Sequence, residues 1–135
     1  MRFYFGRTAT LTFFVWCSVL IVDYHNATGA DCDTAKTTKD IVECEDLQLK
    51  NATRTLSDLH KQLNRVLTMK QRKALEKAHA AWLSYREEHC DSAALLYEGG
   101  TMETIVSVTC FAEMTKERVK QLRAAFKLWL TAPKP

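Results

Sequence analysis

The amino-acid sequence predicts an all-α protein, an antiparallel three-helix bundle stapled by two disulfides. Three observations predict this fold: apolar residues recur at helical spacing along three stretches, four cysteines follow an apolar N-terminal segment, and turn-forming residues are scarce. After residue 30 the glycines are Gly99 and Gly100, and the prolines are Pro133 and Pro135. A many-stranded β protein needs more turn residues than these, so the composition argues against that class.

The first helix is predicted from apolar residues spaced three and four positions apart. These residues are Ala52, Leu56, Leu59, Leu63 and Val66. The segment from Thr68 to Gln71 has the pattern of a capping box, which begins a new helix, so we expect the first helix to stop near Leu67. Apolar residues between 41 and 49 are spaced less regularly, and they either extend this helix or form a separate short N-terminal helix.

The second helix is predicted to end at Gly99-Gly100, because glycine adopts the left-handed conformation that closes a helix. Its apolar and aromatic residues again follow helical spacing. They are Leu75, Ala78, Trp82, Tyr85 and His89.

The third helix is predicted to begin at Thr101, whose hydroxyl would cap it, with Glu103 in its positive first turn. The β-branched run from Thr104 to Thr109 locally favours a strand, but the longer helical stripe outweighs it. That stripe consists of Ile105, Val108, Ala112, Thr115, Val119, Leu122, Phe126 and Trp129.

Residues 1–30 are predicted to be a signal peptide. Two arginines precede an apolar stretch from Ala9 to Val22, which is shorter than the roughly 20 residues that span a membrane. Small residues at 28–30 suit cleavage after Ala30, and a retained membrane anchor is the alternative. We expect a mature domain of residues 31–135, exported to the periplasm or secreted, with no stable membrane insertion after cleavage.

Cys32, Cys44, Cys90 and Cys110 are predicted to form two disulfides, because cysteines in an exported chain are usually paired. Counting residues back from the two turns places all four at the same end of the bundle. Four cysteines allow three pairings. We favour Cys44–Cys90 with Cys32–Cys110, because this pairing ties all three helices together. The pairing Cys90–Cys110 with Cys32–Cys44 is a close alternative.

Four sequence blocks occur in an order and spacing that are characteristic of one protein family. They are Cys32…Asp40-Ile41-x2-Cys44, Trp82-x2-Tyr85-Arg86-x3-Cys90, Gly99-Gly100-Thr101 and Cys110-x4-Thr115-x2-Arg118-x3-Leu122. From about residue 31 to 126, the chain resembles the LprI-like lysozyme-inhibitor N-terminal domain. The resemblance implies a secreted or envelope-associated bacterial helical domain, in a family named after a member that inhibits lysozyme. It also implies a protein partner, a lysozyme-type glycosidase.

The aromatic and arginine residues of these blocks have two interpretations. Trp82, Tyr85 and Arg86 are predicted on one face of the second helix, and Arg118 of the third helix is expected near Trp82. An arginine over the indole would fix the register of the helices. The same residue types are also favoured as binding hot spots. Similarly, Gly99-Gly100-Thr101 is either a plain turn or an inhibitory loop that enters a partner's cleft.

The sequence argues against an enzyme, a metal site and a nucleic-acid partner. His89 beside Cys90 does not make a known metal-ligand spacing, and His60 and His79 have no nucleophile in a known catalytic arrangement. The 19 basic and 16 acidic residues are interspersed without a basic block, so we expect no nucleic-acid binding. We therefore predict a binding protein that needs no cofactor.

Two functions follow from these observations. The first is inhibition of lysozyme or a related wall-degrading glycosidase, in which an acidic end of the bundle attracts a basic enzyme. The second is an envelope interaction or structural module with an unrelated protein partner, for which the long exposed helix faces argue. The acidic residues, which a solvated helix face would equally explain, are Glu87, Glu88, Asp91 and Glu98.

Overall fold

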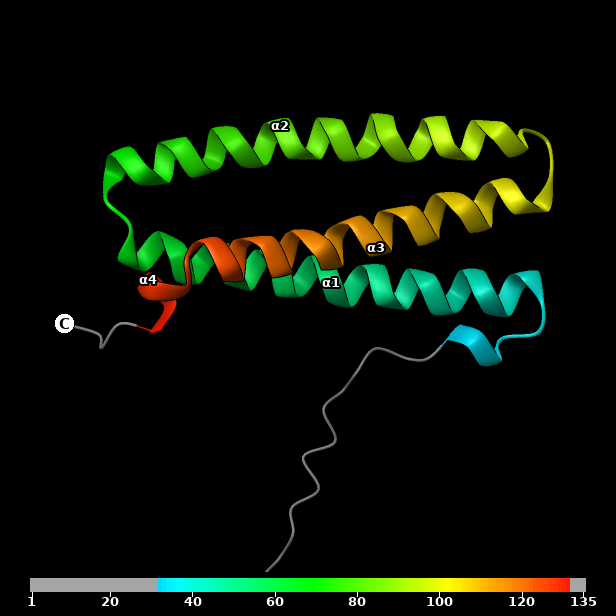
Figure 1. Ribbon diagram of the computed structural model, residues 1–135. Helices are drawn as coiled ribbons and strands as arrows, with labels where there is room; N and C mark the ends of the chain where they lie inside the picture. The colour runs from blue at the N-terminus through cyan, green and yellow to red at the C-terminus, as the bar shows by residue number, and fades with distance from the viewer. Residues whose placement is uncertain (1–31, 132–135) are drawn as a thin grey trace, which may run out of the picture.

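Three long antiparallel helices form the described part of the protein. The structure is a computed structural model that describes residues 32–131; residues 1–31 and 132–135, and with them the predicted signal peptide, lie outside the described residues. The three-helix architecture is confirmed (Figure 1). The elements are η1 (Cys32–Thr34), α1 (Thr38–Val66), α2 (Met69–Ala94), η2 (Leu95–Tyr97), α3 (Thr101–Ala125) and α4 (Lys127–Thr131).

Capping boxes begin the first two long helices. At α2 the predicted box is present: the Thr68 hydroxyl accepts from Gln71 N–H at 3.4 Å, and Gln71 Oε1 accepts from Thr68 N–H at 2.9 Å. At α1 a second box joins Thr37 and Asp40. Because this box starts α1 at Thr38, residues 41–49 belong to α1 and do not form a separate helix.

The turn between α2 and α3 contains the predicted glycines, but the predicted end of the second helix is wrong, because α2 ends at Ala94 and the short η2 follows it. Gly99 has a φ of +77°, a left-handed conformation that glycine adopts at little cost. The predicted cap at Thr101 is wrong, because Gly100 occupies the N-cap position and Thr101 is the first helical residue. Instead, Glu103 Oε2 accepts a hydrogen bond from Gly99 N–H at 2.9 Å and ties the turn to the first turn of α3.

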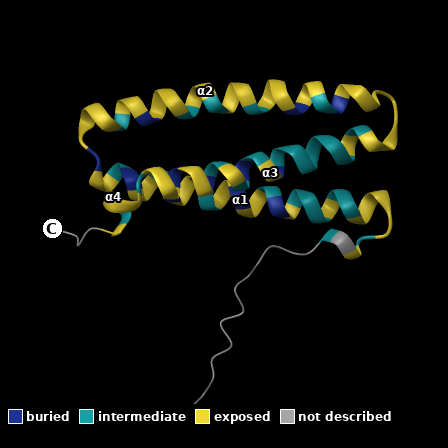
Figure 2. Ribbon diagram, in the orientation of Figure 1, coloured by how far each residue is buried: buried dark blue, intermediate teal, exposed yellow. Residues whose placement is uncertain are grey.

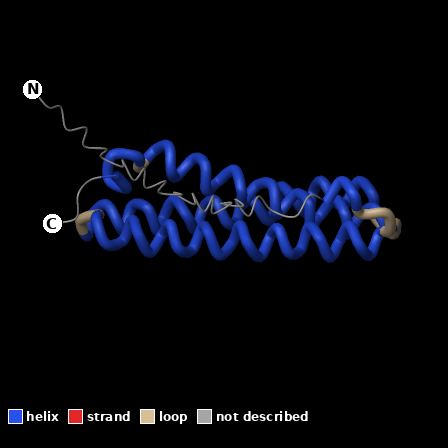
Figure 3. Tube along the Cα trace, turned by 90° about the horizontal axis from the view of Figure 1, so that it is seen from below, coloured by secondary structure: helices blue, strands red, loops and turns tan. Residues whose placement is uncertain are grey.

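The apolar core is concentrated near the turn between α1 and α2. Helices α1 and α3 pack most closely, α2 lies along α3, and α2 is exposed over most of its length (Figure 2). Seen from below, the described chain is helical except for short connections at the ends of the bundle (Figure 3). The core residues are Leu56, Leu59, Leu63, Leu67, Leu75, Val119 and Leu122, with Trp82, Phe126 and Leu130 packed against them.

The inner face of α2 differs from the predicted stripe. Tyr85 is 57% exposed and His89 is also exposed, so neither faces the core. Consecutive helical positions are about 100° apart, and the stripe moves one residue along, from Tyr85 to Arg86 and from His89 to Cys90. The observed inner face consists of Leu75, His79, Trp82, Arg86, Cys90 and Ala94.

Two predicted core residues at helix ends are also exposed. Val66 is 41% exposed, and the neighbouring cap residue Leu67 fills the core in its place. The predicted third helix ends early, at Ala125, and the chain continues as α4 after Phe126. This break leaves Trp129 42% exposed.

The favoured disulfide pairing is wrong, and the alternative pairing is present. Cys32 joins Cys44 with 5.8 Å between their Cα atoms, and Cys90 joins Cys110 with 5.6 Å. The start of α1 and the α2–α3 turn lie at the same end of the bundle, so the predicted gathering of the four cysteines is correct (Figure 1). Each bridge joins elements that are close in sequence: Cys32–Cys44 joins η1 to α1, and Cys90–Cys110 joins α2 to α3.

In residues 32–131, none of the helices combines the length and the apolar character needed to cross a membrane.

Candidate functional site

An arginine–aromatic layer lies between α2 and the other two long helices. Arg86 Nη1 donates to Thr115 Oγ1 at 2.8 Å, and the fully buried Thr115 donates in turn to the Phe111 carbonyl at 2.7 Å. The Arg86 guanidinium lies 4.9 Å from the centre of the Trp82 ring and 5.2 Å from that of Phe111. Arg118 approaches the same indole from α3 at 5.6 Å. These contacts favour the interpretation that the arginines set the register of α2 on α3.

Two histidines continue this layer toward the core. The rings of His60 on α1 and His79 on α2 lie 4.2 Å apart, and His79 stacks on Trp82 at 5.8 Å. Burial lowers the pKa of both histidines, and the neighbouring Arg118 lowers each pKa further. Burial also lowers the pKa of Arg86, an effect that Glu87 partly offsets. The layer therefore favours neutral histidines beside charged arginines.

Acidification is expected to destabilise this layer. The histidine pKa is about 6.5 in the unfolded chain and lower in the folded chain, so below pH 6.5 the unfolded chain binds more protons. The stability contributed by neutral His60 and His79 is complete above about pH 6.5 and is lost as the pH falls toward the folded pKa. Urea unfolding midpoints measured at about pH 7.5 and about pH 5 should show this loss.

The double variant His60→Leu/His79→Leu should flatten that pH dependence. His89→Ala is the matched control, because His89 is exposed and lies toward the far end of α2. An unchanged pH slope in the double variant would show that other groups cause the acid sensitivity.

The end of the bundle beyond the second disulfide carries an exposed apolar surface, which we call the apolar tip. Leu96 is 82% exposed, Leu95 62%, and Tyr97 and Met102 are 46% exposed each. The Gly99–Glu103 hydrogen bond and the Cys90–Cys110 bridge fix the two helices that carry the tip. Several large apolar side chains exposed within one turn are typical of protein interaction sites.

A hollow of about 660 Å³ adjoins the apolar tip between α1, α2 and α3. Leu95 and Asp91 line it from the α2 side, Glu103 and Phe111 from α3, and Leu49 from α1. The exposed side chains of the tip thus lie beside a concave surface. Shape complementarity at an interface would require a partner that has both a cleft for the tip and a projecting surface for the hollow.

The surroundings of the apolar tip are acidic. From Glu87 to Thr115 the chain carries six acidic residues and neither lysine nor arginine. Glu87, Glu88, Asp91 and Glu98 are exposed, and within residues 32–131 the structure records no ion pair for any of them. The exposed carboxylates of this end therefore outnumber the nearby cations, of which Arg86 is the one directly before Glu87.

The structure separates the predicted site residues into three groups. Trp82, Arg86, Thr115 and Arg118 meet in the arginine–aromatic layer. Gly99 and Gly100 form the turn at the apolar tip, close to the Cys90–Cys110 bridge. Cys32 and Cys44 staple the start of α1. Tyr85 belongs to none of these groups, because it is exposed on α2 and contacts the His89 ring at 5.6 Å.

Sequence reasoning missed the apolar tip itself. Leu95, Leu96 and Tyr97 are three consecutive apolar residues directly before a turn, and one helical face cannot bury all three. This pattern is the signal that would have identified them. In the described part of the chain, histidine, cysteine and acidic side chains form no group of three or more that could hold a metal ion.

Comparison with known proteins identifies the family. Residues 30–122 match the family described as lysozyme inhibitor LprI. The chain belongs to the LprI lysozyme-inhibitor family. An uncharacterized protein of Rhizobium meliloti (strain 1021) is 40% identical over 50 residues, which is 37% of this chain and 36% of that protein. The match thus spans about a third of the curated relative's length, and no solved structure matches.

Family membership agrees with the resemblance seen in the sequence and with the two disulfides. The family is named for inhibition of an enzyme and not for catalysis. Disulfides persist in oxidising compartments, so both bridges and the family are consistent with an extracytoplasmic location.

Proposed function

We propose that this protein is an exported inhibitor of a lysozyme-type glycosidase, in the periplasm or outside the cell, and that the apolar tip is its binding surface. The observation that carries the proposal is the set of strongly exposed apolar side chains at the α2–α3 turn, framed by exposed acidic residues for which residues 32–131 record no ion pair. Family membership supports this proposal. The tip would enter the substrate cleft and exclude the wall polymer, without taking part in chemistry.

Charge supports the same partner. Lysozymes are commonly basic proteins, and unpaired carboxylates around the tip would speed their encounter with it. Affinity itself would come from the apolar side chains that the complex buries, because such buried residues carry most of the binding energy at protein interfaces. The Cys90–Cys110 bridge would hold these side chains in place before binding and reduce the entropy that binding costs.

The inhibition assay follows lysis of bacterial walls by chicken-type, goose-type and invertebrate-type lysozymes with excess mature protein. The variant Leu96→Asp is expected to weaken inhibition by about 30-fold or more, because it places a charge in the buried centre of the complex. Leu128→Asp on α4 is the matched control, since Leu128 is 75% exposed at the opposite end of the bundle. Circular dichroism checks that both variants fold.

Two results would contradict this proposal. Undiminished lysis by every lysozyme, with no complex in a binding assay, would exclude inhibition. Full inhibition by Leu96→Asp would exclude the apolar tip as the binding surface.

The second candidate is an envelope interaction module with an unrelated protein partner. Its specific support is Tyr85, an aromatic residue that is 57% exposed on α2 and lies away from the inner face of that helix. Capture of one dominant non-lysozyme protein that is lost with Tyr85→Ala, and kept with Leu96→Asp, would favour this candidate.

A further inference from the structure

A long groove runs between α1 and α3 toward α4, away from the apolar tip. Two adjoining cavities of about 520 Å³ and about 540 Å³ form it, and both are lined by Thr55 and Arg123. Its α1 side extends from Gln48 to Gln62, which at about 1.5 Å per residue is roughly 20 Å. We call this feature the basic groove.

The charges of the basic groove are strongly one-sided. Its acidic lining residue is Asp58. The Asp58 carboxylate forms an ion pair with Lys61 Nζ at 3.0 Å, which offsets its negative charge. Its basic lining residues are Arg54, Lys116, Lys120, Arg123 and Lys127.

Three of these cations have no recorded ion pair. Lys116 and Lys120 form ion pairs with neighbouring glutamates on α3, at 2.7 Å and 3.5 Å. For Arg54, Arg123 and Lys127 the structure records no ion pair among residues 32–131. A protein whose net charge is only +3 thus places an excess of positive charge along one groove. Such an arrangement attracts an anion.

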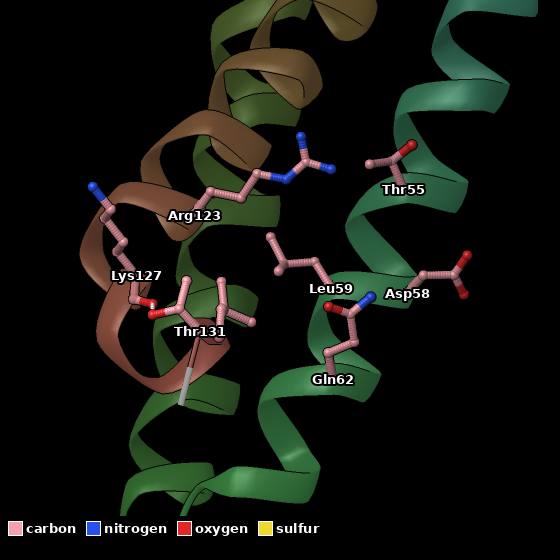
Figure 4. Close-up of a pocket in the computed structure, with 8 residues that line it drawn as sticks. Thr55, Asp58, Leu59, Gln62, Arg123, Lys127 and Thr131 are labelled. Carbon is pink, nitrogen blue, oxygen red and sulfur yellow. Dashed lines mark hydrogen bonds between the residues drawn. The ribbon is translucent and has the colours of Figure 1, made fainter. Parts of the chain in front are cut away.

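The remaining groups of the groove are amides, hydroxyls and small apolar side chains. In the close-up, the Arg123 guanidinium extends from α3 toward Thr55 on α1, and Leu59 lies beneath it (Figure 4). Asn51 and Gln62 add side-chain amides for which the described structure records no hydrogen bond. Amides and hydroxyls are the partners that sugar hydroxyls need.

We propose that the basic groove binds an acidic polysaccharide chain, with the cations holding its carboxylates and the amides and hydroxyls holding its sugars. Neither cavity has an aromatic lining residue in the described part of the chain, so the base stacking that single-stranded nucleic acids use has no platform. The site is concave and elongated, which fits a single extended chain better than a flat lipid surface. The groove shares no lining residue with the apolar tip, so this proposal does not rest on the proposed function.

The probe is polygalacturonate, a carboxylated polysaccharide, with neutral dextran as the uncharged comparison. Affinity electrophoresis of the mature protein should show retardation by polygalacturonate that weakens with salt, and none by dextran. The double variant Lys120→Glu/Arg123→Glu should bind polygalacturonate more weakly by on the order of tenfold or more, because two attractive charges become repulsive.

The matched control is Lys73→Glu/Lys77→Glu, which makes the same change in net charge on exposed residues of α2. Retained binding by this control, with loss in the groove variant, supports the proposal. Equal loss in both variants would show that only net charge matters and would overturn it. Absence of binding by the natural sequence, or tighter binding of polyphosphate or of phosphatidylglycerol vesicles through the same residues, would also overturn it. Lysozyme inhibition by the groove variant should be unchanged, which separates this test from the proposed function.

Discussion

Replacing both Cys90 and Cys110 by alanine is expected to lower the free energy of unfolding by about 3 kcal/mol. The bridge closes a loop with a sequence separation of 20, and releasing such a loop raises the conformational entropy of the unfolded chain by about this amount. The effect is large for a domain of this size, whose net stability is of the order of 5–15 kcal/mol. Urea unfolding followed by circular dichroism measures it.

The location of the bridge makes it important for the fold. The leucine core lies toward the α1–α2 turn, whereas the fully buried residues near the bridge are small: Cys90 itself, Ala112 and Thr115. The disulfide therefore secures the half of the bundle in which apolar burial contributes least. The apolar tip begins five positions after Cys90, so inhibition should weaken along with stability.

Removing the other bridge is the internal comparison. The double variant Cys32→Ala/Cys44→Ala releases a loop of similar size, with a sequence separation of 12. In the folded protein this change also frees the short segment before Thr38. The entropy that the folded chain gains there offsets part of the decrease in the free energy of unfolding. We expect less than half the destabilisation of the first variant. An equal or larger loss would show that η1 belongs to the cooperative core.

Local sequence signals predicted the helices well. The box at Thr68 and Gln71 places the start of α2, and the glycines place the turn before α3, because their chemistry acts within a few residues. The pairing of the cysteines could not be predicted in the same way. All four lie at one end of the bundle, so helix counting alone does not distinguish Cys44–Cys90 from Cys90–Cys110.

The inner face of α2 shows a second limit of sequence reasoning. Tyr85 and Arg86 are adjacent, and apolar spacing alone favours burying the aromatic residue. The fold instead turns the arginine inward, where Trp82 of its own helix and Thr115 and Phe111 of α3 contact it. The two partners on α3 are distant in sequence, so no local pattern reveals them. The exposed apolar tip was missed for a related reason, since exposure also depends on which helices pack together.

Replacing Trp82 by alanine is expected to lower the free energy of unfolding by about 3 kcal/mol, the lower part of the range for loss of a large core aromatic. The indole packs against the leucine core and stacks on His79. It also contacts the guanidinium groups of Arg86 and Arg118. Without the indole, Arg86, Arg118 and the two histidines would line a cavity. Residues 32–131 record no ion pair that would offset the positive charge of the two arginines.

Two further variants separate a packing role of Trp82 from a binding role. Trp82→Phe keeps an aromatic face for the arginines and should recover part of the lost stability. Tyr85→Ala, on the same helix, should change stability by no more than about 0.5 kcal/mol, because Tyr85 is 57% exposed. If Trp82→Ala left stability intact but abolished inhibition, the indole would be a binding residue and the arginine–aromatic layer part of the partner's site. If Trp82→Ala instead lowered stability while the folded fraction still inhibited, the layer would have a packing role and hold α2 in register. The apolar tip would then depend on the layer only through the position of α2.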